Sequence, residues 1–320
     1  MATLRDVVAP PRALVPHLTA FAASRPQWRT RFAPAPTGWL HLGHAVNAVW
    51  VWSIARAFGG RVLLRIEDHD RLRCRPEYEA GVLDDLDWLG LAPDDGTTAT
   101  YRAPGPHPLR QSDRTAAYAE ALAALERAER AYPCRCSRRD IARVVGDAPH
   151  VELRYPGTCR GAGVPASETL ARRVYMADGV EHFHDLRLGE TAQAPARQCG
   201  DVLVRDRHGL WTYQFAVVVD DLAQQIDLII RGEDLLASTG RQRRLAALLG
   251  GASPAVLHHP LVRRADGEKL SKSSRDTGLR DLREAGWTPE RVLGTAAHLS
   301  GLTPSPAPLR AMDLADLWVR

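Results

Sequence analysis

Two short segments of the chain carry imidazoles and ammonium groups at spacings that suit phosphate chemistry. His41-Leu-Gly-His44 follows a loop with two prolines and opens an amphipathic segment, so its side chains and the N–H groups of a helix start would face a triphosphate together. Lys269-Leu-Ser-Lys-Ser273 lies in a polar loop, where both lysines could follow the charge on a leaving pyrophosphate. Alone, either segment is more typical of capping histidines or a solvated loop. Together, the two segments suit a triphosphate and its leaving pyrophosphate.

Three of the five cysteines are close together in the sequence and offer soft metal ligands. Cys134 and Cys136 form a Cys-x-Cys pair, and Tyr155-Pro-Gly-Thr-Cys159 follows them, whereas Cys74 and Cys199 have no ligand-spaced neighbour. Thiolates suit tetrahedral Zn²⁺, but this spacing alone leaves a zinc site and unliganded thiols both open. An odd cysteine count argues against a disulfide framework and favours a reducing compartment, the cytoplasm.

The elements around these segments predict a βαβ unit. Residues 30–33 are a strand candidate, 44–58 an amphipathic helix closed by two glycines, and 62–66 a buried strand. Ligands of such units bind beyond the carboxyl ends of the parallel strands, where the Pro/Gly loop and the acidic residues after 66 both fall. Further helices are expected at 77–89, at 115–131 and beyond 279, and strands at 201–206, 211–220 and 226–230.

Together and in this order, the two phosphate-handling segments resemble the signatures of class I aminoacyl-tRNA synthetases. That resemblance implies ATP binding by His41, Gly43, His44 and Lys272, and catalytic roles for His41, His44, Lys269 and Lys272. Residues 31–38, 65–68, 218–221 and 231–235 resemble blocks of the glutamyl branch. The resemblance implies an α/β fold with a Rossmann-like doubly wound parallel sheet, a zinc-binding insertion and a helical C-terminal segment. It divides the chain into a leader (1–29), a first catalytic half (30–131), an insertion (132–200), a second catalytic half (201–275) and a helical segment (276–320).

Glutamate is the amino acid that the resemblance implies. Its two carboxylates need cations and its ammonium needs an anion or a hydroxyl, and Arg31, Arg231, Glu67 and Tyr213 supply that set. The family block adds four more expected glutamate-binding residues, which are Phe32, Ala33, Pro34 and Ala35.

The cysteine segment resembles the zinc insertion of the glutamyl-queuosine tRNA(Asp) synthetases, short paralogues of glutamyl-tRNA synthetase. That resemblance implies a structural Zn²⁺ held by Cys134, Cys136, Tyr155 and Cys159, and Mg²⁺ accompanying ATP. It further implies activation of L-glutamate as an adenylate and transfer of the glutamyl group to queuosine in the anticodon of tRNA(Asp). The short segment after the second signature agrees, because a chain that charges the 3′ end and also reads the anticodon must span most of a tRNA.

Other functions compete with this interpretation. One is a conventional glutamyl-tRNA synthetase fragment that charges the 3′ end of tRNA(Glu), a second is an adenylate-forming ligase or nucleotidyltransferase such as pantothenate synthetase, and a third is a non-enzymatic nucleotide- or RNA-binding paralogue. A net charge of +4 permits a polyanionic partner without demonstrating one. No apolar run approaches the roughly 18 residues of a membrane span, and residues 1–28 lack a signal-peptide pattern. We expect a monomeric cytoplasmic protein without membrane association.

Overall fold

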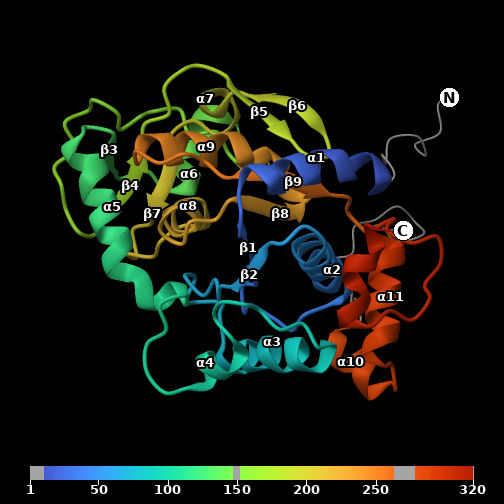
Figure 1. Ribbon diagram of the computed structural model, residues 1–320. Coiled ribbons are helices and arrows are strands. Elements are labelled where there is room, and N and C mark those ends of the chain that lie inside the picture. Colours follow the sequence, from blue (N-terminus) through green and yellow to red (C-terminus); the bar gives the residue numbers. More distant parts are fainter. Residues whose placement is uncertain (1–10, 147–151, 263–277, 320) are drawn as a thin grey trace.

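The first βαβ unit lies at the centre of the molecule (Figure 1). The computed structural model describes residues 11–146, 152–262 and 278–319. β1 (Arg29–Phe32) and β2 (Arg61–Leu64) pair in parallel, with Thr30 opposite Val62, and α2 (Leu42–Ala57) connects them. Because α2 is covered by the sheet, by α11 (Pro289–Leu299) and by the C-terminal 3₁₀ segment Ala311–Leu317, it is buried on most of its surface. The expected strand, helix and strand are confirmed.

A second group of strands extends the sheet beside β1. β8 (Leu228–Gly232) and β9 (Ala255–His259) pair in parallel, and β5 (Glu181–Asp185) joins β9 in parallel and β6 (Gly189–Gln193) in antiparallel orientation. The N–H of Asp227, just before β8, donates to the Arg29 carbonyl at 2.9 Å.

Alternating side chains of the parallel strands pack on opposite faces of the sheet. Leu228 and Ile230 join the apolar cluster around α2, whereas Ile229 joins a second cluster with Val256. Burial on both faces is what a parallel sheet requires. The prediction of an α/β fold built on a parallel sheet is confirmed.

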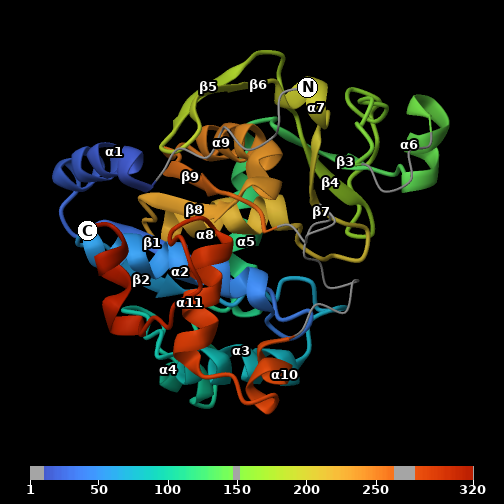
Figure 2. The same ribbon diagram turned by 90° about the vertical axis from the view of Figure 1, so that its right-hand side faces the viewer.

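A separate antiparallel sheet carries the cysteine segment. Its order is β3 (Ala131–Cys134), β4 (Ala171–Val174) and β7 (Val202–Arg205), and α6 (Arg138–Val145) stands at its outer side (Figure 2). The chain alternates between the two sheets. β4 belongs to the antiparallel sheet, β5 and β6 belong to the sheet that contains β8 and β9, and β7 returns to the antiparallel sheet.

The strand predicted at 211–220 is wrong. That stretch contains most of α8 (Tyr213–Ala223), a helix whose first turn follows Thr212. Its valine run favours a strand by local propensity, but Phe215, Val218, Val219 and Leu222 recur at helical spacing and pack in one apolar cluster. Tertiary packing therefore decides the conformation.

Residues of the predicted leader form α1 (Pro11–Ser24), which Figure 1 shows lying along the sheet. Leu14, Leu18 and Phe21 bury in the main core, and the Phe21 ring meets Trp28 edge-on at 5.4 Å. In the part of the chain that the structure describes, no helix is both long and apolar enough to cross a membrane. The remaining helices are α3 (Pro76–Leu89), α4 (Thr98–Arg102), α5 (Thr115–Arg127), α7 (Pro195–Gln198), α9 (Thr239–Leu248) and α10 (Leu279–Glu284), with 3₁₀ turns at Gln111–Arg114 and Glu233–Ser238.

Candidate active site and metal centre

A cleft of about 580 Å³ opens at the carboxyl ends of β1, β2 and β8. It receives side chains from the loop after β1, the start of α2, the loop after β2, the start of α8 and the end of β8. The predicted site residues that line it are Arg31, Ala33, Pro34, Ala35, His41, Gly43, His44, Glu67, Tyr213 and Arg231. Phe32 is different, since its side chain is 2% exposed and meets the Trp52 ring at 5.3 Å in the core.

The two histidines of the first signature cap α2. Nδ1 of His41 accepts the Gly43 N–H and Nδ1 of His44 accepts the His41 N–H, both at 3.1 Å. These bonds place the proton of each neutral imidazole on Nε2, where it can be donated to an anion. A Cβ on Gly43 would lie 3.0 Å from the His41 ring, so glycine here allows the cap itself to form.

Lys269 and Lys272 lie outside the described residues. The residues on either side of that segment reach the cleft: Leu261 and Val262 line it, and Gly278 forms a β-bridge with His41. The Leu279 N–H then donates to the Leu40 carbonyl at 2.8 Å.

Arg231 is a buried cation that donates hydrogen bonds to three neutral side chains. Only 4% of the residue is exposed. Its Nε donates to His258 at 3.1 Å, and its Nη groups donate to Gln242 at 2.7 Å and Thr239 at 2.8 Å. No carboxylate of the described residues forms an ion pair with it, and burial lowers its pKa, with a further contribution from the charge of Arg31. A buried guanidinium without a counter-ion favours an anionic ligand.

Two polar residues of the cleft, Arg31 and Glu67, are linked by one buried network. Arg65, which is fully buried, donates to Glu67 at 2.9 Å and to Asp221 at 2.7 Å. Asp221 also accepts from Arg31 at 3.3 Å, and Arg65 and Arg31 lower the pKa of Asp221 although burial opposes them. Arg31 and Glu67 are therefore held by the same ion pair, Arg31 through Asp221 and Glu67 through Arg65. Burial raises the pKa of the neighbouring Tyr213, so its hydroxyl stays protonated and can donate.

The ligand atoms of Cys134, Cys136 and Cys159 all lie within 4.8 Å of one another. The Tyr155 hydroxyl is 3.3 Å from Cys134 Sγ and 3.9 Å from Cys136 Sγ, so the four predicted ligands do come together. Burial, the contact with Cys159 and the charge of Cys134 raise the pKa of Cys136 to about 11. A soft cation would reverse this by stabilising the thiolates, and the donor set therefore fits zinc.

Tyr155 reaches the thiols because its backbone runs against a glycine. Tyr155 and Gly200 form a β-bridge, and a Cβ on Gly200 would lie 2.0 Å from the Tyr155 carbonyl oxygen. Gly200 also has a φ of 65°, a conformation that side chains disfavour.

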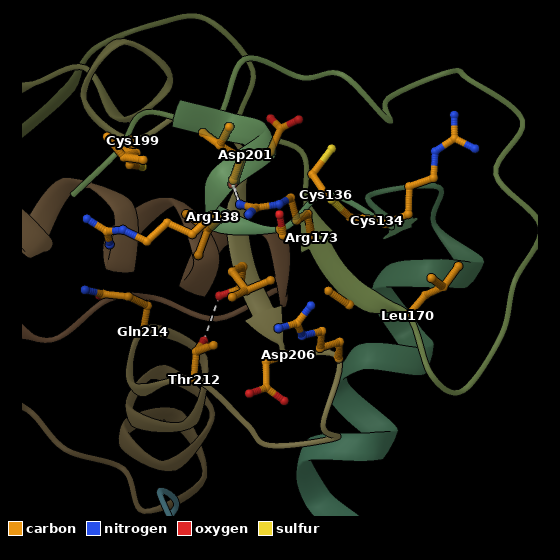
Figure 3. Close-up of a pocket in the computed structure, with 18 of the residues that line it drawn as sticks. Cys134, Cys136, Arg138, Leu170, Arg173, Cys199, Asp201, Asp206, Thr212 and Gln214 are labelled. Carbon is orange, nitrogen blue, oxygen red and sulfur yellow. Dashed lines mark hydrogen bonds between the residues drawn. The ribbon is translucent and has the colours of Figure 1, made fainter. Parts of the chain in front are cut away.

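A second cavity, of about 610 Å³, lies between the cysteine cluster and the cleft. Figure 3 shows Cys134, Cys136 and Arg173 on one side of it and Asp206, Thr212 and Gln214 on the other. Tyr213 lines both the cleft and this cavity. The upper wall is braced by Asp201, which accepts two hydrogen bonds from Arg160 at 2.9 and 2.7 Å.

Comparison with known proteins places this geometry in a family. Residues 27–307 match the model for class I tRNA synthetases (E and Q), catalytic domain. The chain is 40% identical over 301 residues to a Glutamyl-Q tRNA(Asp) synthetase of Nitratidesulfovibrio vulgaris, covering 90% of this chain and 91% of that protein. It belongs to the glutamyl-Q tRNA(Asp) synthetase family of class I synthetases. Another member, from Cupriavidus metallidurans, is 46% identical over 253 residues, which are 78% of each chain.

Solved structures agree with the family fold. A glutamate tRNA ligase from Elizabethkingia meningosepticum, crystallised with its amino acid, is 26% identical with a TM-score of 0.75. The match covers 90% of this chain but 64% of that ligase, so the chain spans less than two thirds of its length. The predicted fold class is therefore confirmed as the class I synthetase catalytic domain, with a helical C-terminal part and a cysteine cluster able to bind metal.

Sequence analysis did not assign roles to several residues that shape the cleft. Arg65 and Asp221 lie in the segments 65–68 and 218–221 that resemble the glutamyl branch. The charge of Arg65 at the end of an otherwise apolar strand could have indicated a buried ion pair. His258 and Asp185 carried no signal, because their importance depends on contacts across 73 residues of sequence.

Proposed function

We propose that this protein activates L-glutamate with ATP and transfers the glutamyl group to queuosine in the anticodon of tRNA(Asp). The observation that carries the proposal is Arg231, a buried guanidinium with neutral partners that faces a cleft beside the capped start of α2. Arg231 is complementary to the carboxylate of an anionic amino acid, and the start of α2 is complementary to the phosphates of a nucleotide. The names of the relatives supply the acceptor, which the cleft alone does not specify.

ATP would bind at the start of α2. His41 and His44 present Nε2–H groups, and the N–H groups of the first helical turn favour negative charge. Lys269 and Lys272 would face the phosphates from the segment whose two flanks reach the cleft. Mg²⁺ would accompany ATP and neutralise part of the phosphate charge.

Glutamate would bind on the other side of the cleft. Arg31 and Arg231 would pair with its carboxylates, and Glu67 and Tyr213 would receive its ammonium group. Its α-carboxylate oxygen then attacks the α-phosphorus of ATP, a new P–O bond forms, and the bond to the leaving pyrophosphate breaks. These side chains bind and orient the reactants, so no protein nucleophile takes part.

The acceptor would approach through the second cavity. Its wall shares Tyr213 with the cleft, so a nucleoside bound there would lie beside the activated carbonyl. Unpaired loop bases of RNA can be splayed out into such pockets. Zn²⁺, held by Cys134, Cys136, Cys159 and Tyr155, would fix the wall that the first two of these residues line. We also propose that the protein is a cytoplasmic monomer.

Radiolabelled glutamate tests this proposal. The protein should support glutamate-dependent ATP–pyrophosphate exchange without RNA, and should label tRNA(Asp) that carries queuosine but not tRNA(Asp) with guanosine at that position. Efficient charging of tRNA(Glu) in the same assay would instead indicate a conventional glutamyl-tRNA synthetase activity, and exchange with glutamine but not glutamate would refute the amino acid.

A further inference from the structure

We propose that His258 and Asp185 form a buried relay that positions Arg231 and keeps it available for the ligand carboxylate. The inference rests on the proposed glutamate site and concerns His258 and Asp185, which do not line the cleft. His258 comes from β9, Asp185 from β5 and Arg231 from β8, three neighbouring strands of the parallel sheet. Side chains of His258 and Asp185 are both 0% exposed.

The hydrogen bonds fix the tautomer of His258. Its Nε2 accepts from Arg231 Nε at 3.1 Å and from the Thr239 hydroxyl at 3.2 Å, so this nitrogen carries no proton. Its Nδ1 must then hold the proton, which it donates to Asp185 Oδ2 at 2.5 Å. The direction of every bond in the relay follows from the fact that arginine can only donate.

The carboxylate of Asp185 is held in one orientation by hydrogen bonds to both of its oxygens. Its Oδ1 accepts the N–H groups of Arg187 and Leu188, each at 2.9 Å, in the turn after β5. Its Oδ2 faces His258, accepting from both the ring and the backbone N–H of that residue. The turn therefore aims one carboxylate oxygen at the imidazole.

The relay lets Asp185 orient Arg231 without neutralising it. A carboxylate in direct contact with Arg231 would pair with the guanidinium and compete with a bound glutamate. A neutral imidazole between them accepts a hydrogen bond from Arg231 and donates one to Asp185. The positive charge of Arg231 is then not paired with the carboxylate. Burial and the nearby guanidinium groups of Arg231 and Arg187 lower the pKa of His258 despite Asp185, in keeping with a neutral ring.

Two substitutions of His258 separate the two ends of the relay. Gln places an acceptor near the position of Nε2 and retains the bond from Arg231, whereas Asn reaches only the Asp185 end. In ATP–pyrophosphate exchange we expect His258→Asn to raise the KM for glutamate more than tenfold with less than a twofold change in the KM for ATP, and His258→Gln to recover most of the loss. His184→Asn, on the exposed part of β5, is the matched control and should behave as the unsubstituted protein.

Asp185→Asn tests the tautomer. Because the turn N–H groups keep the amide oxygen, the amide NH₂ faces His258 Nδ1, and the imidazole proton should move to Nε2 and displace Arg231. Nitrogen-15 NMR of histidine-labelled protein should show a protonated Nδ1 on His258 in the unsubstituted protein and a protonated Nε2 in this variant, with a raised KM for glutamate.

The outcomes distinguish the relay from the proposed function. A protonated Nε2 on His258 in the unsubstituted protein would overturn the relay, as would equal effects of the Asn and Gln variants or equal increases in both KM values. If the unsubstituted protein shows no glutamate-dependent exchange, the proposed function fails, and the NMR tautomer together with direct calorimetric titration of glutamate decides the relay.

Discussion

Nη1 of Arg65 lies 2.7 Å from Oδ1 of Asp221, and this pair joins the end of β2 to α8 beneath the cleft. The Arg65 side chain is 0% exposed and that of Asp221 is 5% exposed. Arg31 attaches to the same Asp221 oxygen and Glu67 attaches to Arg65. The pair therefore sets the spacing of two residues proposed to bind the amino acid, although neither partner is proposed to contact it.

Arg65→Met should destabilise the protein strongly. The substitution leaves Glu67 and Asp221 as buried carboxylates without their main cation, which typically costs about 3–5 kcal/mol. Urea unfolding followed by tryptophan fluorescence measures the loss. Arg102→Met is the control, because its partners Asp84 and Asp87 are exposed and such pairs contribute about 0–1 kcal/mol. Equal losses in the two variants would contradict a special role for the buried pair.

Arg231→Gln should weaken glutamate binding far more than ATP binding. The substitution removes the cation that lacks a carboxylate partner among the described residues, so the ligand carboxylate loses about 2–5 kcal/mol of interaction. The KM values for glutamate and ATP in the exchange reaction provide the measurement. Arg291→Gln, on the exposed surface of α11, should change neither value, and a matching rise in both KM values for the Arg231 variant would exclude the proposed role.

Cys134→Ser should lose most of the bound zinc, whereas Tyr155→Phe should retain it with lower affinity. The thiols of Cys134, Cys136 and Cys159 are the stronger ligands, and the phenol occupies the fourth position. Elemental analysis after dialysis against a weak chelator would give about one zinc per chain before substitution. Cys74→Ser is the control, since Cys74 lies outside the cluster. Full zinc occupancy in Cys134→Ser would refute the site.

The sequence was enough to locate the cleft but not to predict the hydrogen bonds that hold its side chains in place. His41 and His44 could be placed because a Pro/Gly loop between a strand and a helix has few possible positions in a βαβ unit. The helix at 213–223 was missed because its valines have strand propensity, although its apolar spacing was helical. Arg231 was named among the expected glutamate-binding residues, whereas His258 and Asp185 could not be connected with it, since only the strand order in the sheet brings them together.

Asp85 should give the protein a stability that decreases as pH rises. Burial in α3, followed by the charge of Asp84, raises the pKa of Asp85 to about 7, although Arg283 opposes this. The unfolded chain has the ordinary value of about 3.9. Between about pH 4 and 7 the folded state thus binds a proton that the unfolded state does not, and this contribution is lost as pH rises through that window.

Asp85→Asn removes the titration while keeping the shape of the side chain. The difference in melting temperature between Asp85→Asn and the unsubstituted protein should therefore grow in favour of the variant from pH 5 to pH 8. Asp178→Asn, at an exposed position, should give a difference that does not change with pH. A constant difference for Asp85→Asn as well would show that this carboxyl group titrates normally.

Arg207→Glu should impair transfer to RNA while leaving glutamate activation intact. Arg207 is exposed in the turn between β7 and α8 and lines the second cavity, but it does not line the cleft. The turn is ordered by Asp206, whose Oδ1 accepts the N–H groups of His208 and Leu210, each at 2.8 Å, so the substitution changes charge more than backbone. If RNA phosphates pass this turn, the KM for queuosine-bearing tRNA(Asp) should rise. The slope of log KM against log salt concentration should also decrease by about one, which corresponds to one lost phosphate contact.

Arg291→Glu is the control, because α11 lies on the other side of the molecule from β7 (Figure 1). The KM for tRNA at two salt concentrations, measured beside the RNA-independent exchange rate, separates the possibilities. An unchanged KM for tRNA would remove this cavity from the acceptor path, and a parallel loss of exchange would mean that the substitution had disturbed the cleft.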